Sequence, residues 1–81
     1  MKGKPDLVVV TWTDAWGSSG WISLDRANND HKALEVKSVG FVIKTDKKGI
    51  SLTGGFDENE NPSGQTFIPK GMIKTIKKVK Y

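Results

Sequence analysis

The sequence predicts a mainly β protein: a small five-stranded, strongly bent and partly open barrel of the SH3-like or OB-like type. Three observations predict it. Five short segments are rich in β-branched and aromatic residues, a hairpin turn joins two of them, and the longest segment changes its apolar face midway. One short helix is expected after the first strand. The 81 residues make a single domain, 1–81, and a chain this short gains stability by forming oligomers.

The first half of the chain predicts a strand, a turn and a short helix. Residues 7–13, LVVVTWT, are β-branched and aromatic and form the first strand. A Gly/Ser-rich turn follows with Trp16 and Trp21, which either cover an open end of the barrel or are exposed for stacking or binding. Ser23 is a residue type that caps helices, so a short helix is expected over 24–28.

The segment 34–45 predicts a long and bent second strand. Its apolar residues alternate on one face up to Val36 and on the opposite face from Val39 onward, through Phe41 and Ile43. A bulge or a sharp bend near residues 37–38 would produce this change, and the glycine that follows would allow close packing there. Bent strands of this kind let a small sheet curl into a barrel.

The second half of the chain predicts three more strands. The turn DKKG, 46–49, leads into a third strand over 50–56, and a polar, acidic loop follows it. A short fourth strand, 65–68, ends in a tight turn at 69–72. The last segment has apolar residues three positions apart, which suits a helix, but its β-branched residues and its short length favour a final strand.

The positive charge of the chain is concentrated in its last quarter. The net charge is +4, yet residues 1–60 hold eight lysines and arginines against nine acids, while residues 61–81 hold five lysines and no acid. A phosphate-facing patch and an ordinary solvated surface are both open readings. There is no cysteine and no apolar stretch long enough for a signal peptide or a membrane helix. We therefore expect a cytoplasmic protein without membrane contact.

The sequence holds no set of residues typical of catalysis or of metal binding. His31 is the single histidine and lies in a polar stretch, where a solvated side chain is expected. No Ser/His/Asp set and no phosphate-binding glycine loop occurs, and the acidic loop lacks the spacing of a calcium loop. We expect a non-enzyme with no catalytic residue, no metal site and no cofactor.

A resemblance to the Sm/LSm family covers roughly residues 34–80 and rests on two spacings. In the first family motif a Gly is followed six residues later by an Asp. In the second, an Ile is followed by apolar residues five and eight positions later. The matching positions here are Gly40, Asp46, Ile68, Ile73 and Ile76. The whole chain also looks like short uncharacterised proteins of tailed bacteriophages, marine ones included, which would place it in the host cytoplasm.

The family resemblance implies a small barrel that binds single-stranded RNA. In such a fold the turns at 46–49 and 69–72 lie side by side and line the pore of a ring. The candidate nucleic-acid-binding residues are then Lys47, Lys48, Lys70 and Gly71. The chain departs from the family in four places. Pro69-Lys70 stands for the Arg-Gly pair, lysines stand where an aromatic residue stacks on a base, Gly49 is nearest to the Asn that contacts RNA, and the helix before the first strand is missing. Binding is therefore expected to be weak and sequence-tolerant.

The same resemblance implies assembly through strand edges. The fourth strand would pair with the fifth strand of the next copy, and such head-to-tail contacts close into a ring of roughly five to seven copies of this chain. The candidate interface residues are Gln65, Thr66, Phe67, Ile68, Met72, Ile73 and Ile76. The alternative function is a protein-interaction or virion-associated β-barrel module with no nucleic-acid role, which binds through its tryptophan loop or a free edge.

Overall fold

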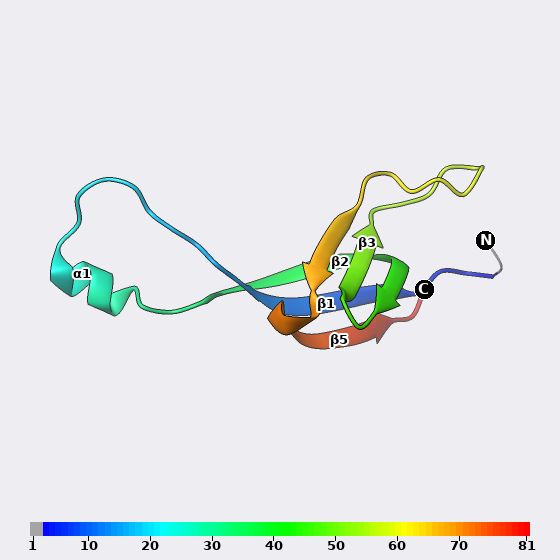
Figure 1. Cartoon of the computed structure of the whole chain (residues 1–81). Helices are drawn as coiled ribbons and strands as arrows, with labels where there is room; N and C mark the ends of the chain where they lie inside the picture. Colours follow the sequence, from blue (N-terminus) through cyan, green and yellow to red (C-terminus); the bar gives the residue numbers. More distant parts are fainter. Residues whose placement is uncertain (1–2) are drawn as a thin grey trace.

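The computed structural model describes residues 3–81, which form one five-stranded antiparallel sheet and one short helix (Figure 1). The elements, in chain order, are β1 (Leu7–Asp14), α1 (Leu24–Asn29), β2 (Leu34–Asp46), β3 (Gly49–Thr53), β4 (Thr66–Pro69), the 3₁₀ turn η1 (Lys70–Met72) and β5 (Ile73–Val79). The order across the sheet is β4-β3-β2-β1-β5. The predicted mainly β class, with a short helix after the first strand, is confirmed.

The core lies where the sheet curls over onto itself without closing. Its fully buried apolar residues come from β1, β3 and β4; they are Val8, Val10, Ile50, Leu52 and Ile68. Two strands separate β1 from β4 in the sheet order, so these strands share a core only because the sheet bends sharply. Trp12 packs partly buried against this core, as its place in an apolar strand suggests.

The second strand changes face, but not at the predicted place. Its pairing with β1 is regular throughout, so the bulge predicted near residues 37–38 is wrong, and Val39 points outward with 65% of its surface exposed. An extra residue, Ile43, instead interrupts the pairing with β3 between Val42 and Lys44. At Gly40 the backbone of β2 lies close to β3, as predicted, since a Cβ there would be 3.0 Å from the Thr53 carbonyl oxygen.

A second bulge explains why apolar residues stand three positions apart in a strand. Ile73 and Ile76 lie opposite Trp12 and Val10, which point to the same face of β1. The extra residue, Lys74, sets both isoleucines on that inner face, although residues three apart normally face opposite ways. The final segment is therefore a strand, as predicted. Ile73 packs against the core, whereas Ile76 is 47% exposed.

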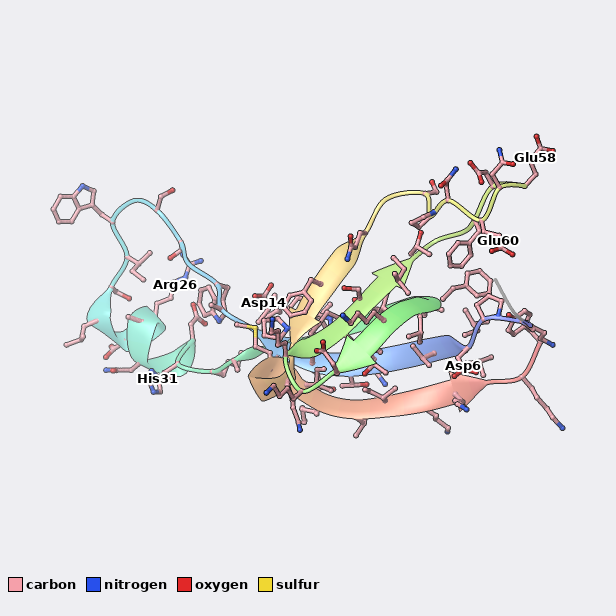
Figure 2. All side chains as sticks on the ribbon, turned by 45° about the vertical axis from the view of Figure 1, so that its right-hand side comes forward. Asp6, Asp14, Arg26, His31, Glu58 and Glu60 are labelled. Carbon is pink, nitrogen blue, oxygen red and sulfur yellow. The ribbon has the colours of Figure 1, made fainter. Side chains whose placement is uncertain are left out.

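The third strand is shorter than predicted. β3 ends at Thr53, and Phe56 lies outside it, in an isolated bridge with Pro62. The Gly54-Gly55 pair that follows β3 has no side chains to pack, which favours ending the strand there. The acidic loop then extends away from the sheet, with Glu58 and Glu60 at its far end (Figure 2).

The chain between β1 and β2 leaves the sheet as a long arm, which we define as residues 14–35 (Figure 1). The two strands pair out to Asp14 and Leu34, and α1 lies beyond them at the far end. The molecule measures 54 × 24 × 22 Å, and its radius of gyration is 16.6 Å. A compact domain of this length would have a radius of about 12 Å. The arm therefore makes the molecule elongated.

Hydrogen bonds within the arm shape its outer part. Ser23 caps α1, as predicted, because its Oγ accepts a hydrogen bond from the Arg26 backbone N–H at 3.2 Å. The Trp16 indole N–H donates to the Lys32 carbonyl oxygen at 2.7 Å and closes the neck of the arm. No residue of α1 is buried. In the described residues, 3–81, no helix is long and apolar enough to cross a membrane.

Candidate nucleic-acid interface

The two lysine-bearing turns lie side by side in the structure. Gly49, at the end of the first turn, pairs with Pro69, and the Lys70 backbone N–H donates to the Lys48 carbonyl oxygen at 3.0 Å. The four predicted nucleic-acid-binding residues thus come together at one exposed corner of the sheet. We call Lys47, Lys48, Lys70 and Gly71 the lysine corner.

Short-range chemistry forms the first turn of the corner. The Asp46 Oδ1 accepts a hydrogen bond from the Lys48 backbone N–H at 2.9 Å, which is a turn that aspartate favours. Gly49 then lies directly under β4: a Cβ there would meet the Ile68 carbonyl oxygen at 2.3 Å. Only glycine allows the two turns to approach this closely.

Proline and the 3₁₀ turn form the second half of the corner. Pro69, with φ of −61°, ends β4 and leads into η1, and the Ile73 backbone N–H donates back to the Lys70 carbonyl oxygen. Gly71 has open space around it, because no atom lies within 4 Å of where its Cβ would be. A ligand could therefore approach the backbone closely at Gly71.

The lysine side chains of the corner are unneutralised. Among residues 3–81, the ammonium groups of Lys47, Lys48 and Lys70 have neither an ion pair nor a hydrogen bond. The carboxylate of the first turn, Asp46, is 3.8 Å from the ammonium of Lys44. Asp46 is thus partly neutralised from outside the corner, and the corner keeps three exposed positive charges available to an anion.

A hollow of about 340 Å³ opens beside Lys70. It is lined by Thr45, Asp46, Gly49, Lys70, Ile73 and Ile76. The two isoleucines make it apolar on the β5 side, while the charged side chains stand on the side of the turns. It exists because the sheet does not close, so the inner face of β5 remains partly uncovered.

The predicted interface residues fall on both edges of the sheet and on the turn between them. β4 and β5 are the outermost strands, and within residues 3–81 neither pairs with a further strand. Thr66, Phe67 and Ile68 belong to β4; Ile73 and Ile76 belong to β5; Met72 ends η1; and Gln65 precedes β4.

Their side chains differ in what they can offer to a partner. Ile68 is only 1% exposed and belongs to the core, so only its backbone edge is accessible. Gln65 is held within the chain, since its Nε2 donates to the Ser51 Oγ at 2.9 Å. Phe67, Met72 and Ile76 are exposed apolar side chains. Exposed apolar groups on free edges are typical of surfaces that associate.

The remaining candidates from the sequence lie on the arm and in the acidic loop. His31 is exposed on the arm and follows α1 in the chain (Figure 2). Among residues 3–81 there is no group of three or more histidine, cysteine or acidic side chains placed to hold a metal ion. Asp57 instead organises its own loop: the backbone and side-chain N–H groups of Asn61 and the backbone N–H of Asn59 bind its carboxylate and lower its pKa.

One ion pair links the base of the arm to the edge of the sheet. The bulge residue Lys74 of β5 places its ammonium 2.9 Å from the Glu35 Oε2 of β2. The hydrogen bond from Lys74 and its positive charge lower the pKa of Glu35. This exposed pair connects the base of the arm to β5, although such pairs contribute little to stability.

Sequence reasoning missed an aromatic cluster near the chain ends. Tyr81 stands edge-on to Phe41 with ring centroids 5.4 Å apart, and the Lys4 ammonium lies 4.1 Å from the Tyr81 centroid. The Tyr81 hydroxyl donates to the Pro5 carbonyl oxygen. Burial of the ring and the nearby Asp6 raise the pKa of Tyr81. The cluster forms because Leu7 of β1 pairs with Phe41 of β2 and also with Val79 of β5, which brings the end of the chain beside Phe41. The residue pattern of one strand does not reveal such pairings.

Comparisons with protein-family models, with curated proteins and with solved structures give no match. The candidate function therefore depends on the residues and the geometry described above.

Proposed function

We propose that this protein binds single-stranded nucleic acid, RNA in the first place, through the lysine corner. Binding is weak and sequence-tolerant, because the corner offers positive charge and open backbone but no aromatic ring for a base. The chain acts as a non-enzymatic Sm-like barrel, assembled into a homo-oligomeric ring of roughly five to seven copies that repeats the corner around one axis. Repetition makes a weak site useful, since several corners hold one strand together.

The observation that carries the proposal is the hydrogen bond from the Lys70 N–H to the Lys48 carbonyl oxygen. It fixes two turns that are more than twenty residues apart in the sequence as one surface. The three ammonium groups on that surface have no partner within residues 3–81. Fixed turns with free lysines bind a phosphate backbone at less entropic cost than a mobile basic tail.

The test is oligonucleotide binding as a function of salt, with oligo(U) and oligo(A), for the wild type and for Lys47→Ala/Lys48→Ala/Lys70→Ala. The wild type should bind at low salt, and affinity should fall steeply as salt rises. Each lost phosphate contact lowers the slope of log K against log salt by about 0.7 for a single strand, so the triple variant should lose about 2 in slope per chain.

A matched control removes three lysines elsewhere on the chain: Lys37→Ala/Lys77→Ala/Lys80→Ala. Lys37 and Lys77 pair with β1 residues on the outer face of the sheet, away from the turns. This control has the same net charge as the triple corner variant, so bulk charge effects cancel. Equal loss of binding in both variants, or no binding by the wild type at low salt, would contradict a site at the corner.

A gain-of-function variant sharpens the test. Asp46→Asn removes the carboxylate beside the corner but keeps an oxygen that can accept the hydrogen bond from the Lys48 N–H. We expect tighter binding of the oligonucleotide at low salt, because a phosphate strand no longer meets a negative charge at this turn. Unchanged affinity in Asp46→Asn would mean that the strand does not pass beside the first turn.

The alternative function, a protein-interaction or virion-associated module, is supported by a different part of the molecule. The arm presents Trp21 fully exposed to solvent, with further exposed apolar side chains beside it. Such a surface is typical of a protein contact and not of a phosphate contact.

A further inference from the structure

The far part of the arm exposes an unusual amount of apolar surface. Trp21 is fully exposed and Leu24 is 76% exposed, and Trp16, Ile22 and Leu34 are also largely open to solvent. α1 has six residues and buries none of them. Helices this short are marginal in water, and tertiary packing normally supplies most of their stability. Exposure on this scale indicates that a partner covers the arm.

The charge of the arm indicates what kind of partner this is. The arm has four carboxylates, Asp14, Asp25, Asp30 and Glu35, against two basic side chains, Arg26 and Lys32. Its formal net charge is −2, but Glu35 pairs with Lys74 of β5, and Asp30 pairs with Arg26 within the arm. The carboxylate of Asp25, beside the exposed Leu24, has no ion-pair partner among residues 3–81, so the exposed apolar surface carries an unpaired acid and does not favour a phosphate. It is attracted to a basic surface that has an apolar hollow.

The sheet of another copy provides such a surface. The hollow beside Lys70 has Ile73 and Ile76 on its β5 side, and Ile76 remains 47% exposed although it shares the inner face with core residue Val10. The volume of about 340 Å³ is sufficient for a large aromatic side chain. Lys70 lines the same hollow and has no ion-pair partner among residues 3–81, whereas the Asp46 carboxylate, which also lines it, is 3.8 Å from the Lys44 ammonium.

We propose that the arm of one chain docks in the hollow of a second copy of this chain. Trp21 and Leu24 cover Ile73 and Ile76, and the carboxylate of Asp25, next to Leu24 in the first turn of α1, faces Lys70. The contact thus joins an apolar anchor to an apolar hollow and an acid to a base, as stable interfaces do. The contact needs no nucleic acid, but it pairs Lys70 with a carboxylate, so a docked arm and a phosphate strand compete for this lysine of the corner.

The arm is directed away from its own sheet, which makes the contact intermolecular. β1 and β2 pair regularly out to Asp14 and Leu34, and α1 lies at the opposite end of the 54 Å molecule from the C-terminus (Figure 1). Trp21 is fully exposed, so it does not occupy the hollow of its own chain. When each copy gives its arm to one neighbour and receives the arm of another, the contacts close into a ring and every chain buries one arm.

The first test is the mass of the protein by light scattering over a series of concentrations, without nucleic acid. The wild type should be an oligomer, and Trp21→Ser/Leu24→Ser should weaken association about tenfold or more, so that the mass falls to the monomer value of 8.9 kDa. Neither side chain is buried within the chain, so the variant should unfold at the same temperature as the wild type when both are compared at concentrations where the wild type is dissociated. A monomeric wild type overturns the proposal.

The hollow side has its own variant and its own control. Ile76→Ser should reduce the mass in the same way. Val39→Ser should leave the mass unchanged, because it removes a more exposed valine from the outer face of the sheet. If the oligomer survives the loss of Trp21 and Leu24, assembly uses the strand edges and not the arm, and the proposal is overturned.

Reversal of the two charges tests the orientation of the arm. Asp25→Lys should weaken the oligomer, because it sets two positive charges against each other, and adding Lys70→Asp on the same chain should restore the mass. Restoration by the second change cannot come from a general effect on folding or solubility. Failure of Lys70→Asp to restore the oligomer overturns the placement of Asp25 beside Lys70.

Cysteine cross-linking tests the contact between copies directly, since the chain has no cysteine of its own. A Trp21→Cys chain mixed with an Ile76→Cys chain should form a disulfide-linked pair under mild oxidation, because a disulfide needs Cα atoms within about 7 Å. A Val39→Cys chain in place of Ile76→Cys should give none. Equal yields with both partners would mean random collision, and would overturn the proposal.

These outcomes separate the arm contact from the nucleic-acid proposal. The mass and cross-linking measurements contain no nucleic acid, so they can fail while the lysine corner still binds oligonucleotide. Trp21→Ser/Leu24→Ser keeps all three lysines of the corner, so its low-salt binding can be measured on the dissociated chain. Loss of oligonucleotide binding in the corner variants leaves the result for the arm unchanged.

Discussion

In the sheet, apolar side chains such as Val10 and Ile68 are buried, whereas in the arm Trp21 and Leu24 are open to solvent. Both regions have regular secondary structure and well-formed local hydrogen bonds. The difference is that the sheet curls over its own apolar face, while α1 has nothing in its chain to pack on. Local chemistry is thus sufficient to form an element, but burial needs a second surface, which the sheet provides for itself and the arm does not.

The largest difference in the free energy of unfolding should come from truncating one apolar side chain in each region. Ile68→Ala should destabilise the fold by about 2–5 kcal/mol, since it empties a site in the core. Trp21→Ala should change the free energy of unfolding by less than about 0.5 kcal/mol, although it removes more atoms. Urea unfolding at protein concentrations where the chain is a monomer measures both. A large destabilisation of the monomer by Trp21→Ala would mean that the arm packs on the sheet of its own chain.

Glycines extend the comparison to the backbone. Gly49→Ala should cost about 1–3 kcal/mol, because its Cβ would meet the Ile68 carbonyl oxygen at 2.3 Å and push the two turns apart. Gly20 in the arm also has a positive φ, of +92°, but no atom lies within 4 Å of its Cβ position. We expect less than about half the cost for Gly20→Ala, since an unpacked segment can relax. Equal costs in thermal unfolding would contradict this.

Acid should lower the stability of the fold only weakly. Glu35 at the base of the arm and Asp57 in the acidic loop have pKa values below their ordinary values of 4.5 and 3.8. The folded state therefore favours their charged forms, so their contribution is present at neutral pH. It is lost as the pH falls below these ordinary values and through the lowered pKa of each group. Both groups are exposed, so added salt should reduce the effect of the Glu35 pair.

The measurement for acid is the thermal unfolding midpoint along a pH series. Asp57→Asn should flatten the acid side of that curve, and Lys74→Ala should do so through Glu35. Lys78→Ala is the matched control. Lys78 lies on the same strand as Lys74 but pairs with Asp6 at 3.5 Å, and it does not contribute to the lowered pKa of Glu35. A curve that stays equally steep in Asp57→Asn would contradict the role of that carboxylate.

The smallest effect should come from removing most of the arm. Replacement of residues 16–32 by an Asn-Gly hairpin turn keeps the pairing of Asp14 with Leu34 and removes no buried residue. The free energy of unfolding should change by less than about 0.5 kcal/mol. Hydrogen exchange of the wild type should agree, with fast exchange in α1 and slow exchange in β1 and β3. Unfolding of the shortened chain would show that the sheet depends on the arm.

Much of the secondary structure was predictable because short-range chemistry sets it. The DKKG turn and the Ser23 cap each depend on a few neighbouring residues, and both are present. The lysine corner was also predictable, although only through the family resemblance, which implied that two distant turns meet. The position at which β2 changes its buried face was not predictable. Its apolar pattern suggested a bulge near residues 37–38, but the register with β3 sets the bulge at Ile43.

The strands, the turns, the short helix and the location of the positive charge follow from residue type and from neighbours along the chain, so they can be inferred without the fold. The shared face of Ile73 and Ile76, the open sheet beside Lys70 and the projection of the arm away from the sheet are set by the fold. Those features depend on pairing between strands far apart in sequence. A single extra residue in such a pairing changes which side chains are buried.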